Sequence, residues 1–198
     1  DLQLTAFGKP LPLNEIQQRI PASVQLVQYA LLRDRVVIWV LSKEVFHPPA
    51  ESLIAPAELQ RQVLKFRRDV ATAPVGYDTR YETAGKELYA LLIAPVAHLL
   101  KKKKRLCLVP DGCLNELPFA ALVTPQGQFL VDEYALSLTP SASLFVLSAE
   151  STAARTRGKL LVAAVYQFDK KRFPDLDPLS QMEREAKAIA RLYPNSIL

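Results

Sequence analysis

The pattern of apolar residues between positions 24 and 44 predicts two consecutive strands. Residues 24–32 and 35–44 are rich in β-branched and aromatic side chains, and Arg33 and Asp34 separate them as a turn. Residues 36–41 are apolar at every position, which is typical of a strand covered on both faces. We therefore expect a β-hairpin whose second strand is buried.

Helical periodicity predicts three helices in the first hundred residues. A short one has Pro12 in its first turn, a longer one begins at Pro56, and a third begins near residue 78. The predicted inward positions are Leu13, Ile16 and Ile20, then Leu59, Val63, Phe66 and Val70, then Ala84, Leu88, Leu91 and Leu92. Pro95 must end or kink the third helix, because its ring does not fit a helix interior.

Shorter elements are predicted in the middle of the chain. Residues 106–110 form a buried strand, a loop follows, and Pro118 begins a helical turn. Residues 122–140 predict a hairpin around the turn of residues 125–127, followed by a strand.

The C-terminal part predicts a strand, a helix and a second strand. Residues 159–165 are a short apolar strand, Ser180 and Glu183 have capping-box spacing, and residues 196–198 begin another strand. The predicted inward face of the helix carries Met182, Ala186, Ile189, Ala190 and Tyr193. Such a unit joins parallel strands by a right-handed crossover. The predicted fold class is α/β, with a mostly parallel sheet flanked by helices and an N-terminal antiparallel hairpin.

Composition supports a folded chain. The 198 residues are 49% hydrophobic and 23% charged, so the chain can form a core. No apolar run approaches the roughly 20 residues of a membrane span, and residues 1–10 lack the features of a signal peptide. Because the chain begins with Asp1 and its one methionine is Met182, we expect a piece of a longer polypeptide.

The net charge of +5 comes from one run of five cations, residues 101–105. A nucleic-acid-binding protein usually spreads its cations over a face and interleaves aromatic residues. This run follows an apolar helical stretch instead, where cations complement the helix dipole. We interpret it as a solvated helix end, and the alternative is a patch for phosphate or an acidic partner.

The residues alone identify no active site. Nothing in the spacing joins Cys113 to His98 as a nucleophile and base. Ser141 and Ser143 follow Pro140 without a G-x-S-x-G motif, so we interpret this segment as a helix N-cap.

Acidic, histidine and cysteine residues do not predict a metal site either. We interpret Asp111 and Gly112 as a turn. Asp111 and Glu116 could be taken as a carboxylate pair, but neither side chain has an evident partner in the sequence. Asp169, Asp175 and Asp177 lack the EF-hand pattern, and His47, His98, Cys107 and Cys113 lack zinc-ligand spacing.

Five stretches, in order, resemble the CHAT domain, a caspase-like cysteine peptidase domain often attached to tetratricopeptide repeats. They are VQLVQYALLRDRVVIWVLS, ELYALLIAPVAHLL, RLCLVPDGCLNELPFAAL, LVDEYALSLTPSASL and FPDLDPLSQMEREAKAI. The most specific is LVPDGCLNELPFAAL with the later TPSASL, which combines a strand, a Pro-Asp-Gly turn, a Leu-Pro-Phe helix start and a Pro-Ser cap. The resemblance covers nearly the whole chain from about residue 11.

This resemblance implies an incomplete caspase-like fold. Residues 1–78 would form an N-terminal helix, hairpin and helix subdomain, and residues 79–198 an α/β region leading into the catalytic sheet. The family's catalytic histidine, in a His-Gly-type motif, and its cysteine both follow the strand that begins here at Ser196. No catalytic residue is therefore expected in this chain, and His98 and Cys113 do not take these roles.

The resemblance also suggests where substrate binds. Residues 159–165 resemble the first strand of the caspase-like sheet, and residues 182–193 resemble its first helix. The loop of residues 166–177 would then leave the carboxyl end of a strand, where ligands bind in open α/β sheets. We hypothesise that it lines a substrate groove through Gln167 or Asp169, and the alternative is a solvated connection.

Two functions follow as expectations. The chain would be the N-terminal part of a cysteine endopeptidase, a hydrolase, that supports a downstream His/Cys dyad while being inactive alone. The alternative is a non-catalytic protein-interaction module. The expected partners are a protein or peptide substrate and a tetratricopeptide-repeat region in the same chain or a partner. No cofactor, metal, nucleic acid or membrane is expected, and the expected location is cytoplasmic.

Overall fold

A computed structural model describes residues 10–72, 80–102, 104–153, 160–165, 167–193 and 196–197. It divides into two compact units, Asp1–Glu150 and Ser151–Leu198. The predicted domain boundary after residue 78 lies outside the described residues and stays a prediction. Within the described residues, no helix has the length and apolar character needed to cross a bilayer.

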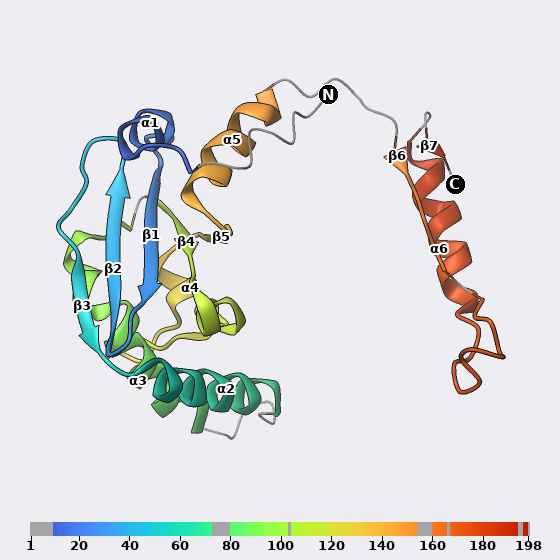
Figure 1. The fold of residues 1–198 in the computed structure, drawn as a ribbon, viewed down its shortest axis with the longest axis horizontal. Helices are drawn as coiled ribbons and strands as arrows, with labels where there is room; N and C mark the ends of the chain where they lie inside the picture. The colour runs from blue at the N-terminus through green and yellow to red at the C-terminus, as the bar shows by residue number, and fades with distance from the viewer. Residues whose placement is uncertain are drawn as a thin grey trace. The chain divides into compact units, whose positions relative to one another are not determined.

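A five-stranded sheet organises the first unit (Figure 1). Its strands lie in the order β3-β2-β1-β4-β5. They are β1 (Val24–Leu31), β2 (Arg35–Ser42), β3 (Ala50–Leu53), β4 (Arg105–Val109) and β5 (Leu136–Leu138). β2 is antiparallel to both of its neighbours, while β1, β4 and β5 run parallel. The α/β class is confirmed, and the sheet is mixed.

The predicted N-terminal hairpin is confirmed. β1 and β2 pair in a register that places Tyr29 opposite Ile38, and the turn is closed by the Leu32 N–H donating to the Arg35 carbonyl at 2.8 Å. β2 is buried along most of its length, as its continuous apolar sequence predicts.

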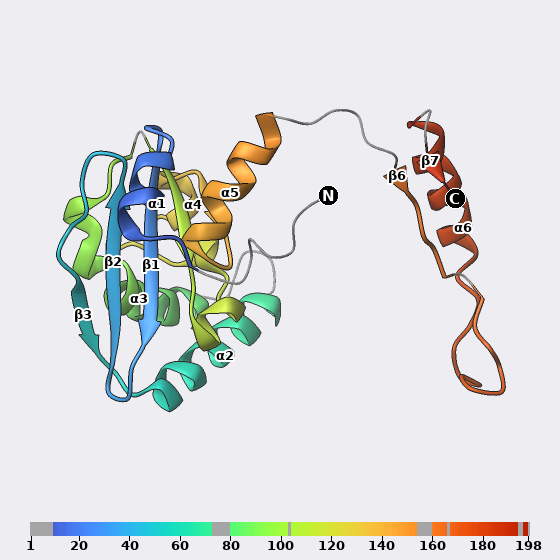
Figure 2. The same cartoon turned by 45° about the horizontal axis from the view of Figure 1, so that its top comes forward.

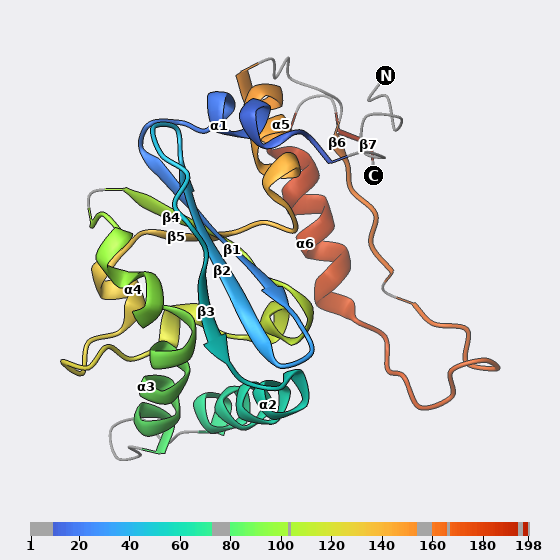
Figure 3. The same cartoon turned by 60° about the vertical axis from the view of Figure 1, so that its left-hand side comes forward.

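One face of the sheet packs on the two predicted long helices, α2 (Pro56–Thr72) and α3 (Arg80–Leu92). The predicted inward positions form this core: Leu59, Val63, Phe66, Ala84, Leu88 and Leu92 are buried. They meet alternate residues of β1 and β2, among them Val27 and Ile38, because successive strand residues point to opposite faces. Figure 3 shows both helices on the same side of the hairpin.

Pro95 ends α3, as predicted, and the chain continues as the 3-10 helix η2 (Ala94–Leu99). Proline has no N–H, so it cannot donate to the carbonyl of Leu91 four residues earlier. The Ser52 hydroxyl donates to that carbonyl instead, at 2.5 Å. The Tyr29 hydroxyl similarly donates to the Leu92 carbonyl at 3.2 Å. Side chains of the sheet thus satisfy the end of this buried helix.

The opposite face of the sheet is covered by α1 (Leu13–Arg19) and α5 (Ala142–Ala153). These two helices lie side by side in all three ribbon views (Figures 1–3). Ile16 and Ile20 are buried in this second cluster, as predicted, whereas Leu13 is 44% exposed.

The predicted turn at residues 125–127 is confirmed, but the hairpin around it is short: the Thr124 N–H donates to the Gln128 carbonyl and the Leu130 N–H donates to the Leu122 carbonyl, both at 2.8 Å. One isolated bridge joins Val123 to Phe129, and a short helix, α4 (Leu130–Glu133), follows it. The Asp132 carboxylate accepts the Phe129 N–H at 3.0 Å, which favours a helical turn over a second strand. The strand predicted after it is present as β5 and pairs with β4.

The predicted strand–helix–strand order of the second unit is confirmed. β6 (Leu160–Leu161) and β7 (Ser196–Ile197) pair in parallel, and α6 (Ser180–Arg191) connects them. The helix begins at Ser180 with Leu179 as its N-cap, one residue before the predicted position. The Ser180 side chain lies outside what the structure describes, so the capping box stays a prediction. The predicted inward face is only partly buried: Ala186 is buried, while Met182, Ile189 and Tyr193 are exposed.

Candidate functional site

The carboxyl end of β6 is the candidate site, because ligands in open α/β sheets bind beyond the carboxyl ends of parallel strands. A groove of about 460 Å³ lies there, between the segment after β6 and one side of α6. Its described lining residues are Leu161, Val162, Ala163, Ala164, Val165, Glu183, Ala186 and Lys187.

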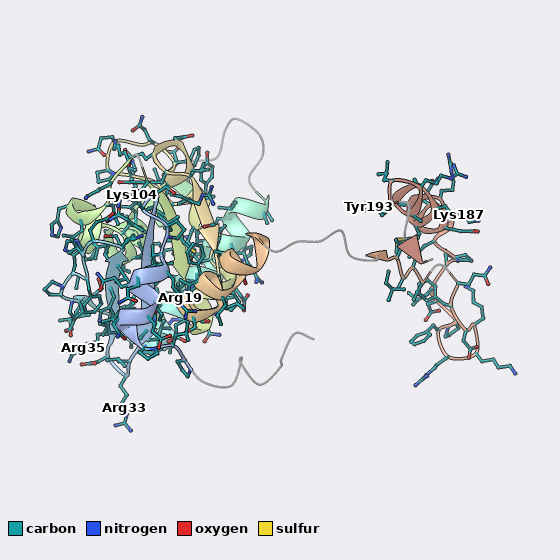
Figure 4. All side chains as sticks on the ribbon, turned by 90° about the horizontal axis from the view of Figure 1, so that it is seen from above. Arg19, Arg33, Arg35, Lys104, Lys187 and Tyr193 are labelled. Atoms are coloured by element: carbon teal, nitrogen blue, oxygen red, sulfur yellow. The ribbon has the colours of Figure 1, made fainter. Side chains whose placement is uncertain are left out.

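The groove has an apolar wall and a charged rim. The alanine and valine side chains of the segment after β6 form the wall, together with buried Ala186. Glu183 and Lys187 stand one helical turn apart on α6 and form an ion pair of 2.5 Å (Figure 4 labels Lys187). None of its described lining residues has a thiol, hydroxyl or imidazole group. The described lining therefore supplies neither a thiol or hydroxyl nucleophile nor an imidazole base.

The two residues predicted to contact substrate follow the groove in the chain. Gln167 and Asp169 are both exposed, and neither is among the described lining residues. The Asp169 carboxylate accepts the Lys171 N–H at 2.9 Å. The backbone carbonyl of Asp169 accepts the Arg172 and Phe173 N–H groups at 3.0 and 2.7 Å. Asp169 therefore shapes a turn in this loop. A role of either residue in substrate binding stays a prediction.

A lysine organises the rest of the loop. The Lys170 ammonium donates to the carbonyls of Leu176 at 2.7 Å and Pro174 at 3.4 Å, and lies 3.7 Å from the Asp177 carboxylate. The loop thus has internal bonds although its residues are exposed. No group of three His, Cys, Asp or Glu side chains suited to a metal ion occurs in the described part of the chain.

Cys113 and His98 do not form a catalytic pair in the structure. Cys113 lies half-buried in the 3-10 helix η3 (Gly112–Glu116) and packs against the main core, whereas His98 is exposed on η2. Burial raises the pKa of the Cys113 thiol, and the nearby carboxylates of Asp111 and Glu116 raise it further. The thiol is therefore mainly protonated at neutral pH, which disfavours it as a nucleophile.

The two serines near the start of α5 are structural. The Ser141 hydroxyl accepts the Leu144 N–H at 3.1 Å, which confirms the predicted N-cap. The Ser143 hydroxyl accepts the Leu11 N–H at 2.9 Å and so fixes the segment before α1.

The two carboxylates near the Pro-Asp-Gly turn also have structural partners. The Asp111 carboxylate accepts the Leu31 N–H at 2.8 Å, which attaches the turn after β4 to the end of β1. Glu116 forms an ion pair with Arg67 of α2. Gly112 has a φ of +50°, in the left-handed region that favours glycine.

The basic run at residues 101–105 is partly neutralised. Lys102 pairs with Glu133 at 2.9 Å, and Lys104 pairs with Glu44 at 2.8 Å. Hydrogen bonds from Lys104 and Ser42 lower the pKa of Glu44 to about 2. The run follows η2, as predicted, and at least two of its cations bind carboxylates of the same unit. This favours a structural role over a patch for an acidic partner.

The mixed α/β sheet, the helices on its two faces and the parallel strand–helix–strand unit define an α/β protein with a candidate groove at a strand end. The family model of the CHAT domain matches residues 82–197. This match covers more than half of the chain, and the chain belongs to the CHAT domain family. A search of curated proteins found no match.

Proposed function

We propose that this chain is the supporting part of a caspase-like cysteine endopeptidase. The observation that carries the proposal is the parallel β6–α6–β7 unit, which lies within the residues matched to the CHAT domain. In this proposal the five-stranded sheet stabilises the protein, and β6 and α6 begin the catalytic sheet.

The chemistry would follow from a histidine and a cysteine outside residues 1–198. A thiolate attacks the peptide carbonyl, an imidazole transfers the protons, and backbone N–H groups stabilise the oxyanion. In this proposal the chain positions the catalytic residues and supplies none of the reacting atoms itself. The raised pKa of Cys113 agrees with this division, because an unactivated thiol is a weak nucleophile at neutral pH.

Gln167 and Asp169 are proposed to contact the substrate, a protein or peptide. Both lie on the loop that follows the groove wall, and both are exposed. The bonds made by Lys170 and Asp169 support this role, since a loop with a fixed shape loses less entropy when it binds. A tetratricopeptide-repeat region, in the same protein or in a partner, is the second proposed partner.

The test uses the natural protein that contains this chain. We expect an electrophilic thiol probe to label one cysteine outside residues 1–198, and alanine at that cysteine to abolish both labelling and peptide cleavage. If neither labelling nor cleavage occurs, the peptidase proposal is wrong and the interaction-module function replaces it. The purified 198-residue chain is expected to show no thiol-dependent cleavage.

The loop is tested in the same protein with a matched control. Gln167→Ala and Asp169→Ala are expected to change the rate or the preference of peptide cleavage. Asp175→Ala removes another exposed carboxylate of the same loop and should leave both unchanged. Wild-type cleavage in all three variants would reject the role of Gln167 and Asp169 without rejecting the peptidase.

A further inference from the structure

A second groove lies in the first unit, on the sheet face covered by α1 and α5. It has a volume of about 440 Å³, within the range of small-ligand sites. Four elements and three segments that adjoin them contribute its described lining: Pro10, Leu11, Leu13, Ile16, Leu26, Gln28, Trp39, Leu41, Phe46, Ser141, Ala142 and Ser143. None of these lining residues belongs to the second unit, which holds the candidate site at β6.

The lining is apolar and carries no charge among the described residues. Trp39 is half-buried and stands opposite Gln28 in the pairing of β1 with β2. Phe46 and Leu13 are 41% and 44% exposed. An ionic ligand would lose hydration here without gaining a counter-charge, so the lining favours an uncharged occupant. Exposed aromatic side chains of this kind often supply much of the binding energy of protein contacts.

Three polar side chains retain hydrogen-bonding capacity in the groove. The Gln28 carboxamide and the Trp39 indole N–H have no hydrogen-bond partner within the described residues. The Ser143 hydroxyl accepts the Leu11 N–H and still has its own proton to donate. The Gln28 carboxamide can both donate and accept hydrogen bonds, as the backbone of a peptide does. A lipid chain would leave this carboxamide without a hydrogen-bond partner.

Pro10 and Leu11, which precede α1, are part of the groove wall. The next residue, Pro12, has φ −59° and ψ 149°, the polyproline II conformation. The backbone N–H of Leu11 donates to the Ser143 hydroxyl, and this bond fixes the segment. The bond between Leu11 and Ser143 shows that a serine at this groove can hold a backbone N–H of an uncharged segment next to proline.

We propose that this groove binds an uncharged, extended apolar peptide segment of a partner protein. Trp39 and Phe46 contact its side chains, and the Gln28 carboxamide pairs with its backbone. Aromatic-lined grooves that bind polyproline II segments use the same combination. The inference is independent of the proposed peptidase function, because no reacting group takes part.

The chain carries its own reporter for the test, because Trp39 is its one tryptophan. The probe is the blocked peptide acetyl-Pro-Leu-Pro-Leu-Pro-Leu-amide, titrated against the purified 198-residue chain while tryptophan emission is recorded. We expect a saturable blue shift, because the peptide excludes water from the indole. The same peptide with glutamate in place of each leucine should cause no saturable shift.

Two groove variants and one control locate the site. Phe46→Ala should weaken binding about tenfold or more, and Gln28→Ala should weaken it several-fold. Leu53→Ala removes an apolar side chain that is 77% exposed on β3 and outside the groove, so its affinity should be unchanged. All three positions are exposed, and far-UV circular dichroism confirms that each variant is folded.

Several results would overturn the proposal. These are a failure of the leucine peptide to saturate, equal affinity for the glutamate peptide, or wild-type affinity in folded Phe46→Ala. A saturable shift with phosphatidylcholine vesicles but not with the peptide would also overturn it, and would identify the groove as a lipid site.

Discussion

Gly85 gives the most direct test of how α3 packs against the segment after β4. A Cβ atom built on Gly85 would lie 2.9 Å from Val123 Cγ2, 3.2 Å from Phe66 Cε2 and 3.3 Å from the Val123 backbone nitrogen. Real side chains almost never approach so closely, and neither a β-branched valine nor a buried ring can move away easily. The Gly85 carbonyl also accepts the Val123 N–H at 3.4 Å.

Two opposing effects decide the result of Gly85→Ala. Alanine is favoured over glycine in a helix interior by about 1 kcal/mol. Insertion of a methyl group into a tightly packed core costs about 1–3 kcal/mol. The Val123 backbone nitrogen and the buried Phe66 ring cannot move away, so we expect a packing cost of about 2–3 kcal/mol, the upper end of this range. After the helix gain of about 1 kcal/mol, Gly85→Ala should lower the free energy of unfolding by about 1–2 kcal/mol.

Urea unfolding followed by circular dichroism measures this loss. Thr83→Ala is the matched control, because Thr83 is exposed on the same helix and alanine there should raise stability by about 0.5 kcal/mol. The double variant with Val123→Ala should lose less than the sum of the two single variants, with a coupling of about 1–2 kcal/mol, because the new methyl group fills the space left by valine. A neutral or stabilising Gly85→Ala, or strict additivity with Val123→Ala, would refute this description of the contact.

Three further predictions use other contacts. Asp111→Ala should destabilise the chain by about 1–2 kcal/mol in urea unfolding because the Leu31 N–H loses its acceptor, whereas Asp111→Asn, which keeps an acceptor, should lose less. The pKa of Glu44 is lowered from 4.5 to about 2, so its bond to Lys104 stabilises the fold above about pH 4.5 and is lost as the pH falls toward 2. The difference in unfolding free energy between wild type and Glu44→Gln should therefore shrink over that range. A difference that stays constant with pH would contradict the assignment. Cys113 should react slowly with iodoacetamide at pH 7 and faster as the pH rises above 9, since its pKa is raised; rapid labelling at pH 7 would contradict its burial.

Local sequence patterns predicted the elements whose residues repeat with a simple period. The stripe of Leu59, Val63 and Phe66 and the continuous apolar run of β2 needed no knowledge of distant residues, and both have the predicted burial. The hairpin around residues 125–127 is shorter than predicted, because a turn sequence does not show how far the flanking residues pair before the chain becomes helical. The bond from Phe129 to Asp132 decided this for the helical turn.

Contacts between distant segments could not be predicted in the same way. The side chain of Gln25 is buried and bonds to the Leu99 carbonyl at 3.0 Å and the Lys101 N–H at 2.7 Å, but nothing near Gln25 in the sequence indicates these partners. The groove at Trp39 was missed for the same reason. Its lining comes together only when the strand register and the positions of α1 and α5 are known. Gln167 and Asp169 were suggested by family resemblance and not by local spacing.

The order of strands in the sheet has a consequence for how the chain folds. β1 and β2 pair across a short turn and can form within microseconds, whereas β1 joins the β4 region through contacts such as Leu31 with Asp111, which are 80 positions apart. Until that pairing forms, a newly made chain exposes one edge of an apolar hairpin and the apolar residues of β4, which could associate with other copies. The five cations at residues 101–105 adjoin that strand and repel their counterparts in a second copy, as gatekeeper charges do beside aggregation-prone segments. In the folded unit Lys102 and Lys104 pair with carboxylates. We therefore expect these two charges to oppose association during synthesis and to be neutralised once the unit has folded.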